Sequence, residues 1–247
     1  MKPKISVVVP AYNEGHAVVG FLDKLFGTLD GPAEVLVVYD FPEDTTAPHL
    51  EDYVRREPRL VPTLNTYGRG PAHAIRYGIE HATADVVVVT MADESDDLHL
   101  IEPLALLVER GAVVAAASRY SRGGRQVGGP LVKRTLSRIA GVSLYWLARV
   151  GTRDATNSFK AYSKSFVVAV GIDSRAGFEI GIELVAKARR LRTPVRELPT
   201  VWHDRTLGTS NFRVLPWLPH YLRWYLFAFG PRLDLAGLRR KATRRSG

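Results

Sequence analysis

The chain has 247 residues, a formal net charge of +9, 46% hydrophobic residues and 24% charged residues, a composition typical of a folded α/β domain and not of a disordered chain. It contains no cysteine, which excludes disulfide bonds, thiolate nucleophiles, zinc–thiolate sites and iron–sulfur clusters, so any metal must bind oxygen or His ligands. The sequence shows no signal-peptide pattern and no run of about 18 apolar residues, so we expect a cytoplasmic protein, either soluble or peripheral on the cytoplasmic membrane face.

The first half of the chain alternates short apolar runs with segments in which apolar residues recur at helical spacing. The runs are rich in Val and nearly uninterrupted, as in strands that are covered on both faces of a sheet. We therefore predict an α/β fold with a Rossmann-like, mostly parallel sheet flanked by helices. The predicted strands are Ile5–Val9, Val35–Val38, Val86–Val89 and Val113–Ala117, and the predicted helices are Val18–Phe26, Ala72–His81 and Leu100–Leu107.

Polar residues follow each predicted strand. Tyr12–Glu14 come after the first strand, Asp40 after the second, Asp93–Asp97 after the third and Arg119 after the fourth. Ligands of open parallel sheets bind beyond the carboxyl ends of the strands, so we expect these residues to meet in one crevice. Crowded carboxylates repel one another unless a cation lies among them, which favours Mg²⁺ or Mn²⁺ at an oxygen-only site. The alternative for Asp93–Asp97 is a helix N-terminus, where acids complement the helix dipole.

A glycine-containing segment, Asn65–Gly70, precedes the second predicted helix. Its backbone could approach a ligand closely, but the full G-x-G-x-x-G pattern is absent, so an ordinary loop is the alternative. Neither G-x-x-x-x-G-K-[ST] nor G-x-S-x-G occurs in the chain. The sequence therefore offers no support for a P-loop nucleotide-binding protein or an α/β-hydrolase.

Basic residues are concentrated in two regions. Between Gly111 and Arg153 there are eight Lys and Arg residues and no Asp or Glu, and a second basic cluster lies within residues 231–247. Regions of this kind attract phosphate groups on a nucleic acid, a lipid or a small substrate. The alternatives are a solvated basic face for the first region and a disordered tail for the second.

Two segments could lie at a membrane surface. Val214–Phe229 is rich in Trp, Tyr and Phe and precedes the basic tail, and Leu131–Val150 has an apolar side next to basic residues. Aromatic side chains favour the headgroup boundary of a bilayer, and basic side chains attract anionic lipid. The alternative for each segment is a helix that packs on the sheet.

Five segments carry a resemblance to a known family: VVVPAYNE, VLVVYD, GRGPAHAIRYGIEHATADVVVVTMAD, SRY and HDRTLGTSNF. In order and spacing they resemble the family 2 glycosyltransferases, specifically the dolichyl- or polyprenyl-phosphate mannose synthase branch, from residue 5 to about residue 215. The resemblance implies a nucleotide-diphospho-sugar transferase (GT-A) fold and an inverting mechanism. With the aromatic and basic segments above, we expect a catalytic domain over residues 1–213, an amphipathic interface segment over 214–230 and a basic tail over 231–247.

The resemblance implies roles for individual residues. Those of the donor nucleotide pocket are Pro10, Ala11, Tyr12, Glu14, Asp40, Gly70 and Asp93. Asp93, helped by Ser95 or Asp96, would bind the metal. Arg119, Arg134 and Arg205 match family positions that bind the acceptor phosphate, and Lys133 is expected there as well because a cation suits an anionic acceptor. The predicted catalytic residues are Asp93, Arg119, Arg134 and Arg205.

This sequence departs from the family pattern at two positions. Met91 stands where the family has the first acid of its Asp-Ala-Asp motif, and Tyr39 replaces the first of two acids after the second strand. The first departure bears on metal coordination and the second on recognition of the base.

The predicted reaction is transfer of a monosaccharide, mannose first, from a nucleotide-diphosphate sugar to a polyprenyl (dolichyl-type) phosphate. GDP-mannose leads as donor, with UDP-sugars as alternatives. A phosphate acceptor is already an anionic nucleophile and needs no strong general base, whereas a hydroxyl acceptor would need a carboxylate to deprotonate it. Two alternatives remain open: a glycosyltransferase for a hydroxyl acceptor, and a catalytically weak subunit that binds nucleotide sugars. We expect peripheral membrane contact, a possible separate membrane subunit and no nucleic-acid partner.

Five further polar residues have open roles. They are Asp154, Asn157, Glu179, Glu183 and Asp204. Asp154 and Asn157 lie in a segment that resembles a family motif, and Glu179 and Glu183, four residues apart on one helix face, could contact the sugar or pair with Lys187 and Arg190.

Overall fold

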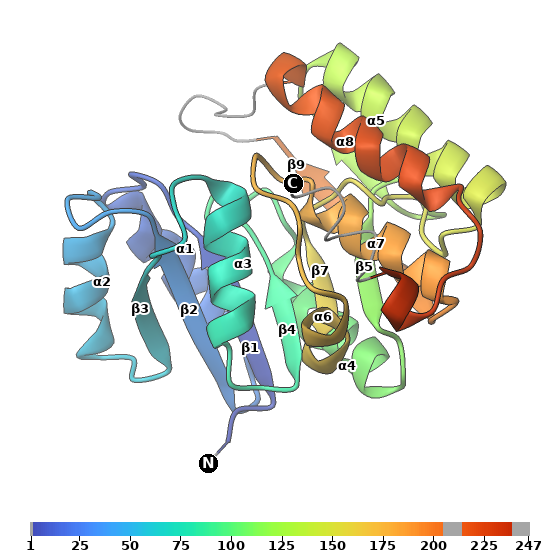
Figure 1. Cartoon of the computed structure of the whole chain (residues 1–247). Helices are drawn as coiled ribbons and strands as arrows, with labels where there is room; N and C mark the ends of the chain where they lie inside the picture. The colour runs from blue at the N-terminus through green and yellow to red at the C-terminus, as the bar shows by residue number, and fades with distance from the viewer. Residues whose placement is uncertain (1, 205–213, 239–247) are drawn as a thin grey trace.

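The computed structural model describes residues 2–204 and 214–238, and its centre is a seven-stranded sheet (Figure 1). The strand order is β3-β2-β1-β4-β7-β5-β8, and every neighbouring pair is parallel except those of β7, which runs antiparallel to both β4 and β5. A two-stranded parallel sheet joins β6 to β9. The strands are β1 Ile5–Pro10, β2 Ala33–Tyr39, β3 Leu60–Leu64, β4 Val86–Val89, β5 Val114–Ser118, β6 Arg125–Val127, β7 Lys160–Ser163, β8 Val195–Pro199 and β9 Val201–His203.

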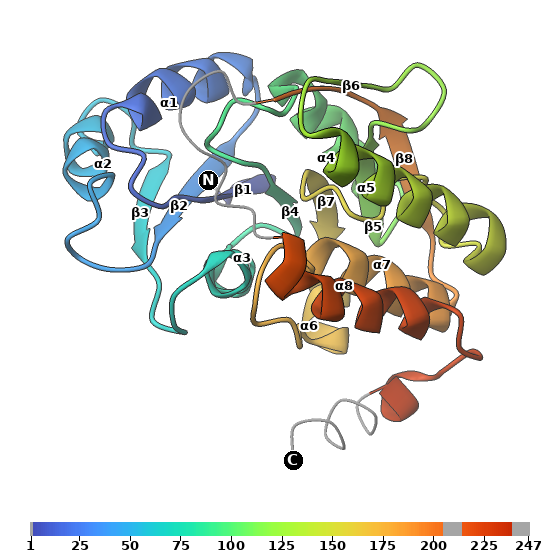
Figure 2. The same cartoon turned by 90° about the horizontal axis from the view of Figure 1, so that it is seen from above.

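Helices cover both faces of the large sheet, as Figure 2 shows from above. One core contains residues of α1, α2 and α4, and the other contains residues of α3, α6, α7 and α8. Alternate residues of one strand enter opposite cores: Val7 and Val9 pack in the first, and Val8 packs in the second. The helices are α1 Ala17–Thr28, α2 Ala47–Val54, α3 Pro71–His81, α4 Ile101–Glu109, α5 Leu131–Ser143, α6 Lys164–Val170, α7 Ile180–Leu191 and α8 Val214–Ala228, with the 3₁₀-helix η1 Leu98–Leu100 and the π-helix η2 Leu144–Ala148.

The four predicted strands and three predicted helices are confirmed as β1, β2, β4, β5, α1, α3 and α4. The sequence analysis missed β3, an outer strand that contains Pro62, which is tolerated because an edge strand need not donate every ladder hydrogen bond. It also missed β7, because four residues that include a lysine do not form an apolar run. The insertion of β7 makes the sheet mostly parallel instead of wholly parallel.

The helices α5 and α8 lie side by side beyond the β5 end of the sheet (Figures 1 and 2). The Ser143 and Tyr225 hydroxyl oxygens, 3.0 Å apart, join α5 to α8. Trp224 and Phe227 of α8 are buried in the core that α7 shares, so the packed-helix alternative holds for one side of the C-terminal segment. Among the helices that the structure describes, none is long and apolar enough to cross a membrane.

Gly78 lies where α3 packs on β1 and β2. A Cβ atom there would lie 3.1 Å from Val38 Cγ2 and closer still to Val8 Cγ1. We expect Gly78→Ala to lower the free energy of unfolding by about 1–3 kcal/mol through overpacking, as measured by urea denaturation. The control is Gly20→Ala in α1, where nothing lies within 4 Å of the added Cβ; it should raise stability by about 0.5–1 kcal/mol. Equal stabilities of the two variants would contradict this account.

Candidate active site

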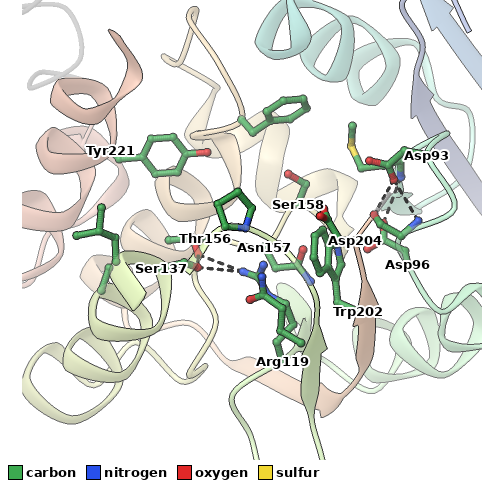
Figure 3. A pocket seen from close by; sticks show the side chains of 18 of the residues that line it. Asp93, Asp96, Arg119, Ser137, Thr156, Asn157, Ser158, Trp202, Asp204 and Tyr221 are labelled. Carbon is green, nitrogen blue, oxygen red and sulfur yellow. Dashed lines mark hydrogen bonds between the residues drawn. The ribbon is translucent and has the colours of Figure 1, made fainter. Parts of the chain in front are cut away.

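A cavity of about 390 Å³ lies beyond the carboxyl ends of β4 and β5, next to α5 and α8 (Figure 3). Its polar lining includes acids from the loop after β4 and a cation from the end of β5. Its apolar lining comes largely from α5, α8 and the segment before α7. The lining residues are Met91, Asp93, Ser95, Asp96, Arg119, Gln126, Gly129, Pro130, Leu136, Ser137, Ala140, Thr156, Asn157, Ser158, Phe178, Trp202, Asp204, Leu218 and Tyr221.

Acids of the loop after β4 have two different roles, one as a helix cap and the other in the cavity. Asp97 accepts a hydrogen bond from His99 N (3.3 Å) and so caps η1, as the helix-terminus alternative requires. Asp93 Oδ1 accepts from Ser95 Oγ at 2.6 Å, and Asp96 Oδ2 accepts from Thr90 Oγ1 at 3.0 Å and from Met91 N at 3.2 Å. Asp93 and Asp96 therefore face the cavity from a loop whose shape their own side chains fix.

Asp96 is 9% exposed. The pKa of the Asp96 carboxyl is raised to about 7, mainly by burial and also by the neighbouring Asp93, although hydrogen bonds from Met91 and Thr90 act in the opposite direction. One carboxyl of this close pair therefore holds a proton near neutral pH. A bound cation would stabilise the state in which both are ionised.

The residues present fit a divalent cation shared with a diphosphate. Among the residues that the structure describes, no group of three or more His, Asp or Glu is gathered for a metal. Mg²⁺, however, commonly takes one or two protein carboxylates and completes its shell with substrate phosphates and water. Asp93 and Asp96, with the Ser95 hydroxyl, supply that oxygen-only set in the cavity.

Arg119, at the end of β5, is held by Asp154. Its Nε donates to Asp154 Oδ2 at 2.7 Å and its Nη2 to Asp154 Oδ1 at 2.9 Å, and the Arg119 main-chain N–H also donates to Oδ2 at 3.0 Å. Nη2 further contacts Ser137 Oγ at 3.1 Å and Thr156 Oγ1 at 3.5 Å (Figure 3). A planar guanidinium fixed in this way presents a preset cation to the cavity.

The Arg119–Asp154 pair is deeply buried, and its charges depend on each other. Burial lowers the pKa of Arg119, but the attraction of Asp154 outweighs it and leaves that pKa above its ordinary value. Burial likewise raises the pKa of Asp154, but Arg119 outweighs it and leaves that pKa below its ordinary value. Removal of one partner would leave the other charge buried and uncompensated.

The four cations predicted for the acceptor phosphate differ in their position relative to the cavity. Arg119 lines the cavity. Arg134 lies in α5 three residues before Ser137 but is not part of the lining. Lys133 also lies in α5, with its side chain outside the described part of the chain, and Arg205 lies outside the described residues.

Most residues predicted for the nucleotide do not line this cavity: Pro10, Ala11, Tyr12 and Glu14 lie at or after the end of β1, Asp40 directly after β2 and Gly70 directly before α3. Of the predicted set, Asp93 lines the cavity, so the expectation of a single crevice is only partly met. Asp40 Oδ1 accepts from Asn65 Nδ2 at 2.8 Å, and Asp40 Oδ2 accepts from Gly70 N at 2.7 Å. These two bonds direct Asp40 toward the Asn65–Gly70 loop.

Around that loop, aromatic rings and a cation meet. The Tyr12 ring meets the Phe41 ring edge-on at 5.9 Å, and the Arg69 guanidinium lies 4.8 Å from the Phe41 ring centroid. Pro10 and Ala11 are buried at the end of β1, while Tyr12 is exposed and Glu14 is partly buried. Planar groups of this kind can stack with a base.

The sequence analysis missed several lining residues. Ser137 and Tyr221 come from α5 and α8, and Trp202 comes from β9. Only Ser137 had a signal, since it shares a helix face with Arg134 at a spacing of three residues. Trp202 and Tyr221 reach the cavity through tertiary packing, which the sequence pattern does not show.

The five polar residues whose roles the sequence left open lie in different places. Asn157 and Asp204 line the cavity, and Asp154 holds Arg119. Glu179 accepts from the main-chain N–H groups of Ala176 and Gly177. Glu183 pairs with Lys187 at 2.5 Å within the buried face of α7, which is the structural alternative.

Solved structures with a similar fold include two transferases. Glucosyl-3-phosphoglycerate synthase from Mycobacterium tuberculosis, in complex with Mn²⁺, UDP and glucosyl-3-phosphoglycerate, aligns with a TM-score of 0.61 at 18% identity over 94% of this chain and 82% of that chain. A mannosyltransferase from Pyrobaculum calidifontis, in complex with GDP-mannose and Mn²⁺, aligns with a TM-score of 0.63 at 18% identity over 98% and 70%. At these identities the likeness establishes the GT-A fold.

Two curated relatives are more similar in sequence. A dolichol-phosphate mannosyltransferase of Pyrococcus furiosus is 27% identical over 232 aligned residues, which cover 89% of this chain and 63% of that protein. A polyprenol monophosphomannose synthase of Mycolicibacterium smegmatis is 26% identical over 212 aligned residues, which cover 83% of this chain and 79% of that protein. The chain thus spans less than two thirds of the Pyrococcus relative.

Residues 6–171 match the sequence profile of glycosyl transferase family 2. This match covers β1 to the start of the segment before α7, including Asp93, Asp96, Arg119 and Asp154. Together with the two curated relatives, it identifies the chain as an enzyme that transfers a sugar: the protein belongs to glycosyl transferase family 2.

Proposed function

We propose that this enzyme moves a monosaccharide, mannose first, from a nucleotide-diphosphate sugar to a polyprenyl phosphate with inversion at the anomeric carbon. The observation that carries the proposal is the polarity of the cavity. Arg119, Asp93 and Asp96 lie in its polar part, and Leu136 and Leu218, both about half exposed, lie in its apolar part. A phosphate on a long apolar chain matches both parts.

The proposed acceptor-phosphate site consists of Arg119 with Ser137 and Thr156, and includes Lys133, Arg134 and Arg205 from the sequence analysis. An oxygen of the acceptor phosphate attacks the anomeric carbon of the sugar. The bond from that carbon to the diphosphate breaks, and its electron pair leaves with the nucleoside diphosphate. Since the acceptor oxygen is already anionic, the chain's residues need to position it and not to deprotonate it.

The leaving group is proposed to meet Asp93, Ser95 and Asp96. A bound Mg²⁺ or Mn²⁺ would stabilise the negative charge that develops on the diphosphate. The two carboxylates hold the site, and the nucleoside is proposed to lie toward Pro10, Ala11, Tyr12, Glu14, Asp40 and Gly70. GDP-mannose and UDP-sugars are the donors to compare, because the similar solved structures contain GDP-mannose in one case and UDP in the other.

A hydroxyl acceptor is the second candidate, and one residue favours it. Asp204 lies in the cavity lining and is exposed, so it could serve as the general base that a neutral acceptor requires. A catalytically weak subunit that binds nucleotide sugars is the third candidate, since Met91 departs from the acid expected at this position from the family resemblance.

Peripheral contact with a membrane is part of the proposal. Leu218, Leu222 and Leu226 recur at four-residue spacing on the exposed side of α8. Leu131, Ile139, Trp146 and Leu147 of α5 and η2 are 61–74% exposed. An exposed apolar surface of this extent, next to the cavity and near basic residues of α5, fits the headgroup boundary of a bilayer. A separate membrane subunit is an alternative occupant of this surface.

The reaction class is tested by transfer of radiolabelled sugar from a panel of GDP- and UDP-sugars to polyprenyl phosphate in detergent. We expect label in the organic phase with Mg²⁺ or Mn²⁺ and none with EDTA. A parallel panel of sugar and alkyl alcohol acceptors is the control. Transfer to alcohols alone would overturn the phosphate acceptor, and donor binding without any transfer would favour the weak subunit.

Asp96 predicts a pH dependence of metal binding. Below a pH of about 7 its carboxyl is protonated, and a cation must displace that proton, so binding of Mn²⁺ with a nucleoside diphosphate should weaken by about tenfold per pH unit on acidification. Above that pH the affinity should level off. Titration calorimetry between pH 5.5 and 8.5 measures this, and Asp96→Asn should bind more weakly and lose the slope. A wild-type affinity that does not change over this range would refute the assignment.

The membrane contact is tested with a Leu147→Asp/Leu222→Asp variant in a flotation assay with anionic phosphatidylglycerol vesicles. Each leucine contributes about 1.5–3 kcal/mol when buried, so vesicle binding should fall at least tenfold. Turnover of a short, water-soluble isoprenyl phosphate should persist, because neither residue lines the cavity. Leu106→Asp, which changes an exposed leucine of α4, is the control. Unchanged vesicle binding of the double variant would remove η2 and α8 from the interface.

A further inference from the structure

Lys160 is a lysine with no exposed surface in the middle of the sheet. It begins β7, where it pairs with Val89 of β4 and with Ala116 of β5. Its ammonium donates a hydrogen bond to the main-chain oxygen of Asn157. A Cβ atom on Gly181 of α7 would lie 3.2 Å from Lys160 Nζ, so the absence of a side chain there leaves room for the ammonium.

The bond to Asn157 closes a turn that lines the cavity. Asn157 N donates to Asp154 Oδ1 at 3.2 Å, and Asn157 Nδ2 donates to the Ala117 main-chain oxygen of β5 at 2.9 Å. Lys160 therefore holds one side of the Asp154–Asn157 turn, while β5 holds the other. The carboxylate at the start of this turn is the one that binds Arg119 in three hydrogen bonds.

The charges around Asp154 also single out Lys160. Within the trio of Lys160, Asp154 and Arg119, two cations face one carboxylate, which leaves a surplus of positive charge when Lys160 is protonated. The pKa of Lys160 is lowered to about 7, mainly by burial and also by the charge of Arg119, while the carboxylates of Asp154 and Asp96 oppose the lowering. Burial of the Lys160 charge lowers the stability of the fold, and an apolar side chain of the same length would fill the space without this cost. Stability alone therefore does not explain a lysine here.

We propose that Lys160 is a positioning residue of the transfer site: it holds the Asp154–Asn157 turn and, through Asp154, fixes the direction in which Arg119 meets an anionic substrate group. The inference rests on the proposed function insofar as that group is the acceptor phosphate. Lys160 itself lies below the cavity lining and touches no substrate.

The first test is kinetic and uses Lys160→Met, which keeps the length of the side chain and removes its donor and charge. We expect kcat/KM for the acceptor to fall at least tenfold, with the KM of the donor and the melting temperature close to those of the wild type. The control is Lys164→Met, because the ammonium of Lys164 also donates to a single main-chain oxygen, that of Ala82, away from the cavity. Lys164→Met should leave both kinetic constants unchanged.

The second test does not depend on the acceptor. Hydrogen exchange of Arg119 Nε–H, followed by ¹H–¹⁵N NMR and assigned with Arg119→Lys, reports whether the guanidinium stays locked on Asp154. Exchange at least tenfold faster in Lys160→Met than in the wild type and in Lys164→Met is expected. A folded Lys160→Met protein with the wild-type exchange rate would overturn the proposal.

Two further outcomes are distinguishable. If Lys160→Met does not fold, Lys160→Gln carries the same test, because it removes the charge and withdraws the donor by one bond from Asn157. If the wild type transfers no sugar to polyprenyl phosphate, the proposed function fails, whereas the exchange of Arg119 Nε–H still decides the role of Lys160.

Discussion

The ion pair between Arg119 and Asp154 is the interaction on which the site depends. It joins the end of β5 to the segment that leads into β7, with the guanidinium 10% exposed and the carboxylate fully buried. β7 is inserted antiparallel between β4 and β5, so the chain must return to the carboxyl edge of the sheet before it enters the strand. Asp154 lies at this return and fixes both the return and the cation. The acids of β4 and the cation of β5 consequently meet across one cavity although β7 separates their strands.

The parts of the fold that the sequence could predict are those with a local physical signal. Buried parallel strands such as Val86–Val89 need apolar residues on both faces, and this need is visible as a run of valines. Asp93–Asp97 could be placed at the site because they follow such a strand, although their division into a cap and a cavity pair depends on hydrogen bonds that only the folded loop makes. Lys160 shows the limit. A lysine in a four-residue strand argues against burial, and its partner carbonyl becomes available only once the turn before it has formed.

The residues predicted for the nucleotide show the same limit of sequence-based prediction. The predicted Asp40 does end its strand, but its two oxygens accept hydrogen bonds from Asn65 and Gly70. The sequence pattern indicated the Asn65–Gly70 segment but not β3 before it, so it did not show that this segment pairs with Asp40. Tyr12, Phe41 and Arg69 come together there from three separate segments. The residues proposed for the base thus lie in a cluster of loops, whereas those proposed for the phosphate and the metal follow the ends of β4 and β5.

The C-terminal end of α7 carries two adjacent arginines that bind other elements. Arg189 donates to the main-chain oxygens of Ala148 and Gly230, where η2 and the helix α8 end, and Arg190 donates to those of Phe227 and Pro231. The helices α5 and α8, which border the cavity and carry the exposed leucines, are therefore fastened at one end to a helix of the core. A displacement of these helix ends away from the core would therefore have to break four hydrogen bonds to α7, two of them made by Arg190, a side chain that is almost fully buried.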